Sequence, residues 1–344
     1  MSILLTGGAG YIGSHAALDF LNSGYEVVII DNFCNSQQEA IKRISDLSGK
    51  KISFYKVDLL NRGQLDEVFS KHKLKAVVHF AGLKAVGESV SDPLKYYENN
   101  VSGTIHLLSI MTKYNVKKLV FSSSATVYGL QDQVPIHESA SLSATNPYGR
   151  TKLIIEEMLR DIYTADSSWR IALLRYFNPT GAHESGLIGE NPNGEPDNLM
   201  PYLTQVAIGK REKLSVFGND YQTKDGTGVR DYIHVMDLVR GHIKALEYLE
   251  NHSGIDVFNL GTGRGYSVLD LIKTFRAESG VDIPFVYTDR RPGDVGEVFA
   301  DAKKAKEKLD WTATKTLQDM CRDSWNWQKK NPNGYESGPP SKNG

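Results

Sequence analysis

The chain has 344 residues, of which 40 are Lys or Arg and 41 are Asp or Glu, so its formal net charge is −1 at pH 7. This balance excludes a generally basic nucleic-acid-binding or membrane-surface protein, and the length predicts about two domains. The chain has only two cysteines, Cys34 and Cys321, which excludes a disulfide scaffold or a cysteine-rich zinc module and fits a reducing compartment.

The apolar run at the N-terminus is about five residues long, too short for a signal peptide or a membrane span. We therefore expect a soluble, cytoplasmic protein with no membrane and no nucleic-acid partner. No group of His, Cys, Asp and Glu has metal-ligand spacing, so no metal is predicted.

Short β-branched runs alternate with helix-length amphipathic stretches through the first half of the chain. The expected strands are Ile3–Thr6, Val27–Ile30, Ile52–Val57, Ala76–Phe80, Leu119–Ser122 and Ile171–Arg175, and the expected helices lie near 12–23, 36–47, 62–72, 91–115 and 147–165. Near-continuous apolar strands are typical of parallel sheets covered on both faces. The alternation predicts an α/β fold, a Rossmann-type doubly wound parallel sheet with right-handed crossovers.

The composition changes after about residue 177. The stretch Pro179–Asn198 is rich in Gly, Pro and Asn, which predicts a long functional loop. Helices are expected near 199–209, 235–250, 267–278 and 316–329, with a strand near 256–260. We expect the Rossmann domain to span 1–177, with segments near 230–262 returning to it. A smaller mixed α/β substrate domain should span 178–335, and 336–344 should form a disordered tail.

Gly7, Gly10 and Gly13 follow the first expected strand and open the first helix. Glycines there allow a tight turn and bring backbone amides to a pyrophosphate, which a helix N-terminus also favours. Asp31, after the second strand, would bind ribose hydroxyls and repel a 2′-phosphate, so NAD is favoured over NADP. Asp58, after the third strand, is either an adenine contact or a turn residue. An ordinary Gly-rich turn is the alternative for the whole motif.

Tyr148 and Lys152 have i, i+4 spacing on the helix expected from 147, so their side chains share one face. A nearby ammonium lowers the pKa of a phenol, and such a tyrosine can serve as general base and acid on a sugar hydroxyl. Ser122–Ser124 place hydroxyls at the end of the fifth strand, where one could bind the reacting oxygen. An exposed amphipathic face and a polar loop are the respective alternatives.

The residues Gly7–Gly13, Asp31, Ser124, Tyr148 and Lys152 together resemble the extended short-chain dehydrogenase/reductase family. Three longer strings, Phe80–Ser89, Leu174–Pro179 and Gly226–Val235, resemble its UDP-glucose 4-epimerase (UDP-galactose 4-epimerase) branch, and the resemblance covers about residues 2–335. It implies reversible C4 epimerisation of UDP-hexoses by transient oxidation to a 4-keto sugar with tightly bound NAD.

The resemblance also implies the role of each catalytic residue. Tyr148 would remove the proton of the sugar 4-hydroxyl, Ser124 would stabilise and relay it, and Lys152 would hold the nicotinamide ribose and keep the tyrosine acidic. A homodimer joined through the helices near 91–115 and 147–165 is implied as well.

Binding residues follow from the same resemblance. Cofactor contacts are implied at Gly7, Gly10, Tyr11, Ile12, Gly13, Asp31, Asn32, Phe33, Cys34, Asn35, Ser36, Asp58, Leu59, Phe80, Ala81, Gly82, Leu83, Lys84, Asn99, Ser124, Tyr148, Lys152 and Phe177. Substrate contacts are implied at Lys84, Ser124, Tyr148, Asn178, Asn198, Leu199, Val216, Phe217, Arg230, Arg291, Asp294 and Val298. Two arginines suit a diphosphate. Surface ion pairs, Arg230 with Asp231 and Arg291 with Asp294, are the alternative.

Val298 departs from the family pattern. Members restricted to unacetylated sugars carry a tyrosine there, so the smaller residue leads us to hypothesise that UDP-GlcNAc and UDP-GalNAc are accepted as well. A one-residue shift of the alignment would put Phe299 at that place instead.

Three other functions remain open. A nucleotide-sugar dehydratase needs an acid beside the strand-five hydroxyl, whereas Ser124 is followed by Ala125 and Thr126. A decarboxylase needs groups that bind a carboxylated sugar. A non-catalytic NAD-binding regulator is disfavoured because both Tyr148 and Lys152 are present.

Overall fold

A seven-stranded parallel sheet forms the centre of the protein, whose computed structural model describes residues 2–131, 133–291 and 294–337. Its strand order is β3-β2-β1-β4-β5-β6-β11. The strands are β1 (Ser2–Thr6), β2 (Glu26–Asp31), β3 (Ser53–Lys56), β4 (Ala76–His79), β5 (Lys118–Ser122), β6 (Arg170–Tyr176) and β11 (Gly254–Leu260). The doubly wound parallel sheet predicted from the sequence is confirmed.

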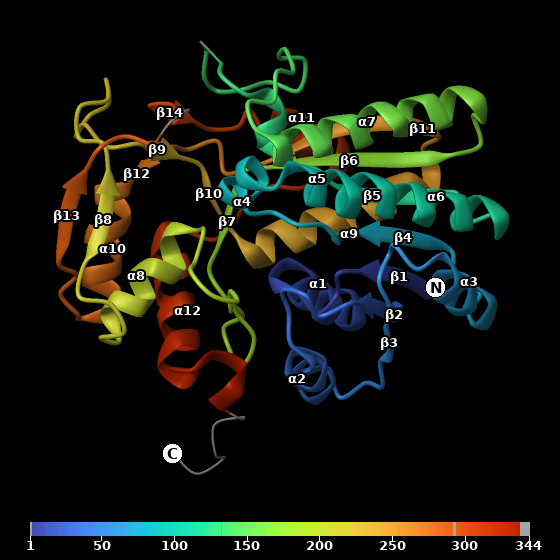
Figure 1. Ribbon diagram of the computed structural model, residues 1–344, viewed down its shortest axis with the longest axis horizontal. Coiled ribbons are helices and arrows are strands. Elements are labelled where there is room, and N and C mark those ends of the chain that lie inside the picture. The colour runs from blue at the N-terminus through green and yellow to red at the C-terminus, as the bar shows by residue number, and fades with distance from the viewer. Residues whose placement is uncertain (1, 132, 292–293, 338–344) are drawn as a thin grey trace.

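Helices cover both faces of this sheet (Figure 1). On one face lie α1 (Tyr11–Asn22), α2 (Gln38–Ser48), α9 (Val235–Asn251) and α11 (Lys303–Leu309), and on the other lie α3 (Arg62–Lys71), α6 (Gly103–Lys113) and α7 (Pro147–Ala165). Ile3 and Leu5 of β1 pack into the first layer and Leu4 into the second, and all three are fully buried. Burial on both faces explains why these strands read as continuous apolar runs.

The register brings the carboxyl ends of the strands to one edge. Thr6 pairs with Ile30 and with His79, and Ser122 pairs with Leu174. Loops that leave successive strands therefore start side by side, which is where ligands bind in open parallel sheets.

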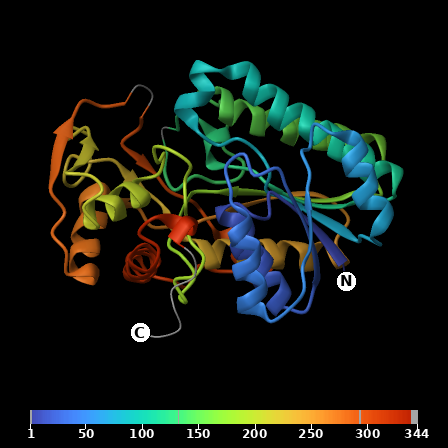
Figure 2. The same cartoon turned by 60° about the horizontal axis from the view of Figure 1, so that its bottom comes forward.

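The second half adds a smaller set of elements beside this edge (Figure 2). Short strands form three small sheets, which pair β8 (Leu214–Phe217) with β13 (Phe285–Thr288), β7 (Asn178–Thr180) with β10 (Tyr232–His234), and β9 (Val229–Arg230) with both β12 (Tyr266–Ser267) and β14 (Glu297–Val298). The helices are α8 (Leu199–Ala207), α10 (Val268–Ser279) and α12 (Leu317–Lys330). Strands of two to four residues show too little alternation to be recognised from sequence.

The helix expected near 91–115 is present as an unbroken helical stretch over 93–113, but it includes a π-helical segment and is separated from a preceding short helix at Asp92. The chain there forms α4 (Val86–Ser91), α5 (Pro93–Tyr96), a π-helix η1 (Tyr97–Ser102) and then α6. Pro93 has no backbone N–H and disfavours a helical Asp92, which instead caps α5 by accepting a hydrogen bond from the Lys95 amide.

Ordered structure also continues two residues past the expected start of the tail. Gly334–Ser337 form a 3₁₀ turn because Tyr335 is buried against Trp327 and Ala40, and 338–344 lie outside the described residues. Within the described ranges, no helix has the length and apolar character needed to cross a membrane.

Candidate active site

In the glycine turn after β1, neighbouring backbone atoms occupy the space that a side chain on Gly7 or Gly13 would need. Gly7 has φ +66°, and a Cβ there would lie 2.8 Å from the Ala81 nitrogen. A Cβ on Gly13 would lie 2.1 Å from the Gly7 carbonyl oxygen. Gly10 is the N-cap of α1 and supplies no capping side chain, so the first amides of the helix remain open to a phosphate. This cradle fits a dinucleotide pyrophosphate.

Asp31 organises the loop that leaves β2. Its carboxylate accepts hydrogen bonds from the Ala9 amide at 2.9 Å, the Phe33 amide at 2.9 Å and the Ser36 hydroxyl at 2.7 Å. Two of these donors lie in the loop itself and one in the glycine turn. The same carboxylate that would receive ribose hydroxyls thus also fixes the turn that would receive the pyrophosphate.

Asp58 is held by contacts to two loops, and it acts as a turn residue, one of the two interpretations offered by the sequence. One carboxylate oxygen accepts from the Leu60 amide at 2.8 Å, which makes it a turn residue. The other accepts from the Asn32 side chain at 2.9 Å, which ties it to the loop after β2. Beyond Asn32, the Phe33 ring packs against Phe54 at a tilt of 48°, and Cys34 is exposed.

Several other predicted cofactor residues are held by local contacts. The Tyr11 hydroxyl donates to the Gly181 carbonyl at 2.7 Å, Ile12 packs on the core, and Leu59 lies under Gly103. Across from the loop after β2, the Asn193 amide donates to Asn35 at 3.4 Å and its side chain donates to the Cys34 carbonyl at 3.2 Å.

The loop Phe80–Lys84 after β4 is fixed by a residue that sequence reasoning missed. Asn100, which is buried in η1, accepts from the Leu83 amide at 2.7 Å and donates to the Leu83 carbonyl at 3.0 Å and to Thr151 of α7 at 3.1 Å. Asn99, the predicted contact, is half-buried at the neighbouring position. Asn100 lies in a π-helix, an irregular element that sequence patterns do not announce.

Ser124 and Tyr148 meet where β5 ends and α7 begins. The Ser124 oxygen accepts hydrogen bonds from the Thr126 amide at 3.2 Å and the Thr126 hydroxyl at 2.9 Å. The remaining Ser124 proton is therefore available to the Tyr148 hydroxyl, and the Ser124 hydroxyl lowers the pKa of Tyr148. Tyr148 follows the N-cap Asn146 and Pro147, which start α7 there.

Lys152 lies one turn further along α7 and is almost fully buried. Its ammonium donates to the Ser122 carbonyl at 2.8 Å and lies 6.0 Å from the centre of the Tyr148 ring. Burial lowers the pKa of Lys152 to about 8, against the charge of Glu156, which raises it. The i, i+4 spacing thus places both groups on one buried face, rather than on an exposed helix surface.

The expected direction of the Tyr148 pKa is wrong for the chain by itself. Burial raises the pKa of Tyr148 well above its ordinary value, the charge of Tyr176 raises it further, and the Ser124 hydrogen bond lowers it. Desolvation of the phenolate outweighs the lysine six ångströms from the ring centre.

A buried ion pair supports this site from behind. Glu156, one turn beyond Lys152, receives two hydrogen bonds from Arg175, at 2.9 and 2.6 Å, and one from the Ser123 hydroxyl at 2.6 Å. Both side chains of the pair are at most 2% exposed. The regular spacing of Tyr148, Lys152 and Glu156 is the signal that could have revealed it.

Arg230 and Val298 lie side by side at the other end of the site. They are register partners in β9 and β14, and Val298 packs against the apolar cluster that contains Val127 and Phe177. Phe299 faces elsewhere, because its ring lies 3.3 Å from the place of a Cβ on Gly265.

The simple ion pairs considered for the arginines are wrong. Arg230 pairs with Asp294 at 3.4 Å, while Asp231 is buried and accepts from Thr262, Gly263 and Ala300. Arg291 instead lies over the Phe217 ring, 4.0 Å from its centre.

The remaining substrate predictions differ in how accessible they are. Asn178 is exposed at the start of β7, and Phe217 and Leu199 are half-buried. Val216 is only 1% exposed and its side chain belongs to a core cluster, so only its backbone is open to a ligand.

Lys84, Asn198 and a third residue, Glu190, form a polar cluster between the two halves. The Glu190 carboxylate accepts from the Lys84 ammonium at 3.1 Å and from the Asn198 amide at 2.7 Å. Burial lowers the pKa of Lys84, but Glu190 outweighs it and the net shift is upward. Glu190 carries no sequence signal, since it lies in a long Gly- and Pro-rich loop.

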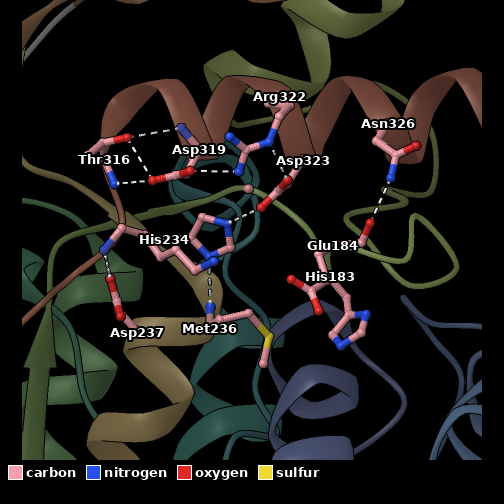
Figure 3. Close-up of polar contacts among 12 residues, drawn as sticks. His183, Glu184, His234, Met236, Asp237, Thr316, Asp319, Arg322, Asp323 and Asn326 are labelled. Atoms are coloured by element: carbon pink, nitrogen blue, oxygen red, sulfur yellow. Dashed lines mark hydrogen bonds and ion pairs between the residues drawn. The ribbon is translucent and has the colours of Figure 1, made fainter.

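His234 connects the loop after β7 to α9 and α12 (Figure 3). Its Nδ1 accepts from the Met236 amide at 3.1 Å, which caps α9, so its Nε2 carries the hydrogen and donates to Asp323 at 3.2 Å. Asp323 also accepts from Arg322 at 3.3 Å. The helix expected near 235–250 is present as α9, and His234 is its N-cap. Its ring packs directly on Gly181, where a Cβ would lie 2.8 Å from Nε2.

Comparisons with known proteins agree with this geometry. A family model described as GDP-mannose 4,6 dehydratase matches residues 4–324. A UDP-glucose 4-epimerase of Bacillus subtilis is 61% identical over 98% of this chain and 99% of its own length, and one from Dictyostelium discoideum is 58% identical over 97% of each. The crystal structure of a UDP-glucose 4-epimerase from Bifidobacterium longum, in complex with NAD⁺ and UDP, superposes with a TM-score of 0.94 at 50% identity, over 97% of this chain and 100% of that one.

Proposed function

Because the chain belongs to the UDP-glucose 4-epimerase family, we propose that it interconverts UDP-glucose and UDP-galactose by reversible oxidation at C4 of the hexose. The observation that carries this proposal is the constellation of Ser124, Tyr148 and Lys152 next to the glycine turn. A phenol, a hydroxyl and a buried ammonium at this place suit removal and return of a hydroxyl proton.

NAD, when bound, takes up the hydride from C4 and gives it back. The glycine turn and the N-terminus of α1 would hold its pyrophosphate, and Asp31 would hold the adenosine ribose. Ser36 and the Ala9 amide already hold the Asp31 carboxylate in place, so this part of the site is formed in advance.

Tyr148 takes the proton of the 4-hydroxyl and later returns it. Its raised pKa in the chain alone means that it becomes a useful base only when positive charge is added nearby. Lys152 supplies one such charge, and the oxidised nicotinamide supplies another. Ser124, which Thr126 orients through two hydrogen bonds, gives its proton toward the phenolate and the sugar oxygen.

The substrate half must hold the UDP part firmly and the sugar loosely, because the 4-keto sugar has to present its other face before it is reduced. Arg230 and Arg291 provide guanidinium groups for the diphosphate. Phe217, already covered by Arg291, provides a flat apolar surface for the nucleotide.

Dehydration is the alternative reaction, because the family model that matches this chain is described as a GDP-mannose 4,6 dehydratase. It needs an acid that expels a hydroxyl next to the oxidised carbon. The partners that the structure gives to Ser124 are Thr126 and Tyr148, neither of which is a carboxylic acid. This favours epimerisation.

The experiment is a product assay that offers UDP-glucose, UDP-galactose, UDP-GlcNAc and UDP-GalNAc separately to the purified protein. We expect both unacetylated sugars to reach the same mixture, and denaturation to release NAD. Loss of water to a keto-deoxy sugar would instead establish the dehydratase.

Activity on the acetylated sugars is a second part of the proposal, and the position of Val298 supports it. A tyrosine at 298 would extend from the cluster around Phe177 into the sugar end of the site. We expect Val298→Tyr to lower kcat/KM for UDP-GlcNAc by at least about tenfold while UDP-glucose turnover changes little.

Val298→Ala is the matched control and should leave both activities close to the wild type. If the wild-type protein converts only the unacetylated pair, the hypothesis of broad specificity is wrong.

A homodimer is the third part of the proposal. A groove of about 340 Å³ between α6 and α7 is lined by Ile105, Leu108, Met158 and Ile162 among others. Val90 of α4 and Leu94 of α5, two helices that also contact α7, are 63% and 79% exposed. Apolar side chains grouped in this way indicate an interface, and a second copy of the chain would cover them.

We expect light scattering to give twice the mass of one chain, and Ile105→Asp to shift the mass to that of a monomer. Tyr287→Asp, which changes a similarly exposed apolar residue on β13, should leave the dimer intact. A wild-type protein that is monomeric at micromolar concentration would reject this interface.

The domain division and the cytoplasmic location complete the proposal. Residues 1–177, with α9 and β11 added to the sheet, would bind NAD, and 178–335 would bind the UDP-sugar. Cys34 is exposed and free, and Cys321 is buried and free, which supports a reducing compartment.

A further inference from the structure

The Glu190 carboxylate lies in a place where simple electrostatics would not put one. It lies between Lys84 and Asn198, two of the predicted substrate-binding residues, and its side chain is only 10% exposed. A negative charge next to a diphosphate site repels the diphosphate and weakens its binding. A carboxylate at this place therefore calls for a role that offsets the repulsion. The contacts of Glu190 show what that role is.

Asn198 is the N-cap of α8, yet its side chain makes no capping hydrogen bond. Its amide group is turned away and donates to Glu190 at 2.7 Å. Asparagine is among the best capping residues, so the free side chain would otherwise turn back to the first amides of its own helix.

The first turn of α8 has few amides to offer. Pro201 has no backbone N–H, so the donors that open the helix are those of Leu199 and Met200. A capping side chain would occupy one of them. Glu190 therefore keeps this helix start open for the oxygens of an anionic ligand.

The backbone that carries Glu190 is anchored from the C-terminal end of the chain. The Trp327 indole donates to the Glu190 carbonyl at 3.1 Å. Gly189 lies so close to the same indole that a Cβ would approach its Cγ to 2.4 Å. The Tyr335 hydroxyl accepts from the Gly189 amide at 3.4 Å. These contacts hold the Glu190 backbone in place, and the carboxylate can therefore hold the Asn198 side-chain amide in one position.

We propose that Glu190 is a positioning residue for the nucleotide diphosphate: it holds the side chain of Asn198 off the N-terminus of α8 and so keeps that helix start free for the ligand. Lys84 neutralises the carboxylate, which limits its repulsion of the ligand. The proposal rests on the UDP-sugar-binding function described above. It assigns Glu190 no role in proton transfer.

The test measures binding of UDP to the full-length NAD-loaded protein by titration calorimetry. We expect Glu190→Ala to raise the Kd for UDP by about tenfold and to raise KM for UDP-galactose more than it lowers kcat. Glu190→Gln keeps an oxygen that can accept from Asn198 and should bind UDP close to the wild type. Glu195→Ala, at an exposed position of the same loop, is the control and should change neither Kd nor KM.

A double-variant cycle tests the route through Asn198. If Glu190 acts by holding this side chain off the helix start, Glu190→Ala should cause no loss of UDP binding in an Asn198→Ala background, where no side chain can reach the first amides of α8. Additive losses would overturn the proposal. A Glu190→Gln variant that binds UDP as weakly as Glu190→Ala would also overturn it. Either result would mean that Glu190 acts through its ion pair with Lys84.

Simple repulsion makes the opposite prediction for Glu190→Ala, namely tighter binding of UDP. Unchanged or tighter binding, in a variant with the thermal unfolding midpoint of the wild type, would overturn the proposal. These outcomes are distinct from a failure of the proposed function, in which the wild-type protein itself would neither bind UDP nor convert UDP-galactose.

Discussion

Replacing Tyr148 by phenylalanine is expected to lower kcat by about 10²- to 10⁴-fold, the range that general acid–base catalysis contributes. The ring is 8% exposed and stays packed in the variant, so the change removes the hydroxyl and little else. KM and the amount of NAD that copurifies should change little. Initial rates with UDP-galactose, together with nucleotide released on denaturation, measure both.

Tyr163→Phe provides a matched control, because Tyr163 lies on the same helix at the far end from the site. It should keep the wild-type rate. A Tyr148→Phe variant that folds, holds NAD and turns over at the wild-type rate would show that the base has been assigned to the wrong residue.

Replacing Glu156 by glutamine is expected to reduce the free energy of unfolding by about 3–5 kcal/mol, the usual cost of breaking a buried ion pair from one side. The guanidinium of Arg175 is 2% exposed and would lose the carboxylate that receives two of its hydrogen bonds. The amide NH₂ that replaces Oε2 would face the guanidinium as a second donor, while Oε1 could still accept from Ser123. Urea unfolding followed by far-UV circular dichroism measures the loss.

An exposed ion pair shows the contrast. Lys303 and Glu307 are 74% and 62% exposed on α11, so Glu307→Gln should change stability by less than about 1 kcal/mol. Equal and small effects of the two substitutions would mean that the pair of Glu156 and Arg175 is hydrated and contributes little.

The parts of the fold that follow from sequence are those with long, regular patterns. Continuous apolar runs such as Val27–Ile30 lie on both faces of a covered sheet, and the strands they predict are present in β1 to β6. The glycine turn was also predictable, because only residues without a Cβ fit where Gly7 and Gly13 pack. Tyr148 and Lys152 follow from their spacing, which needs only the geometry of one helix.

The parts that sequence could not give depend on contacts between distant segments. Asn100 holds the loop after β4 through contacts with Leu83 and Thr151, which lie 17 and 51 positions away along the chain. Glu190 reaches Lys84 across 106 positions of the chain. The sign of the Tyr148 pKa shift depends on burial, which a motif cannot report.

The measurement that tests the central claim most directly is epimerisation in deuterium oxide, followed by proton NMR at C4 of the hexose. If the hydrogen leaves C4 as hydride to a bound cofactor and returns from it, UDP-glucose formed from UDP-galactose will carry its original hydrogen at C4 and no solvent deuterium. Deuterium at C4 of the product, or a product that has lost water, would contradict reversible oxidation with NAD retained in the site.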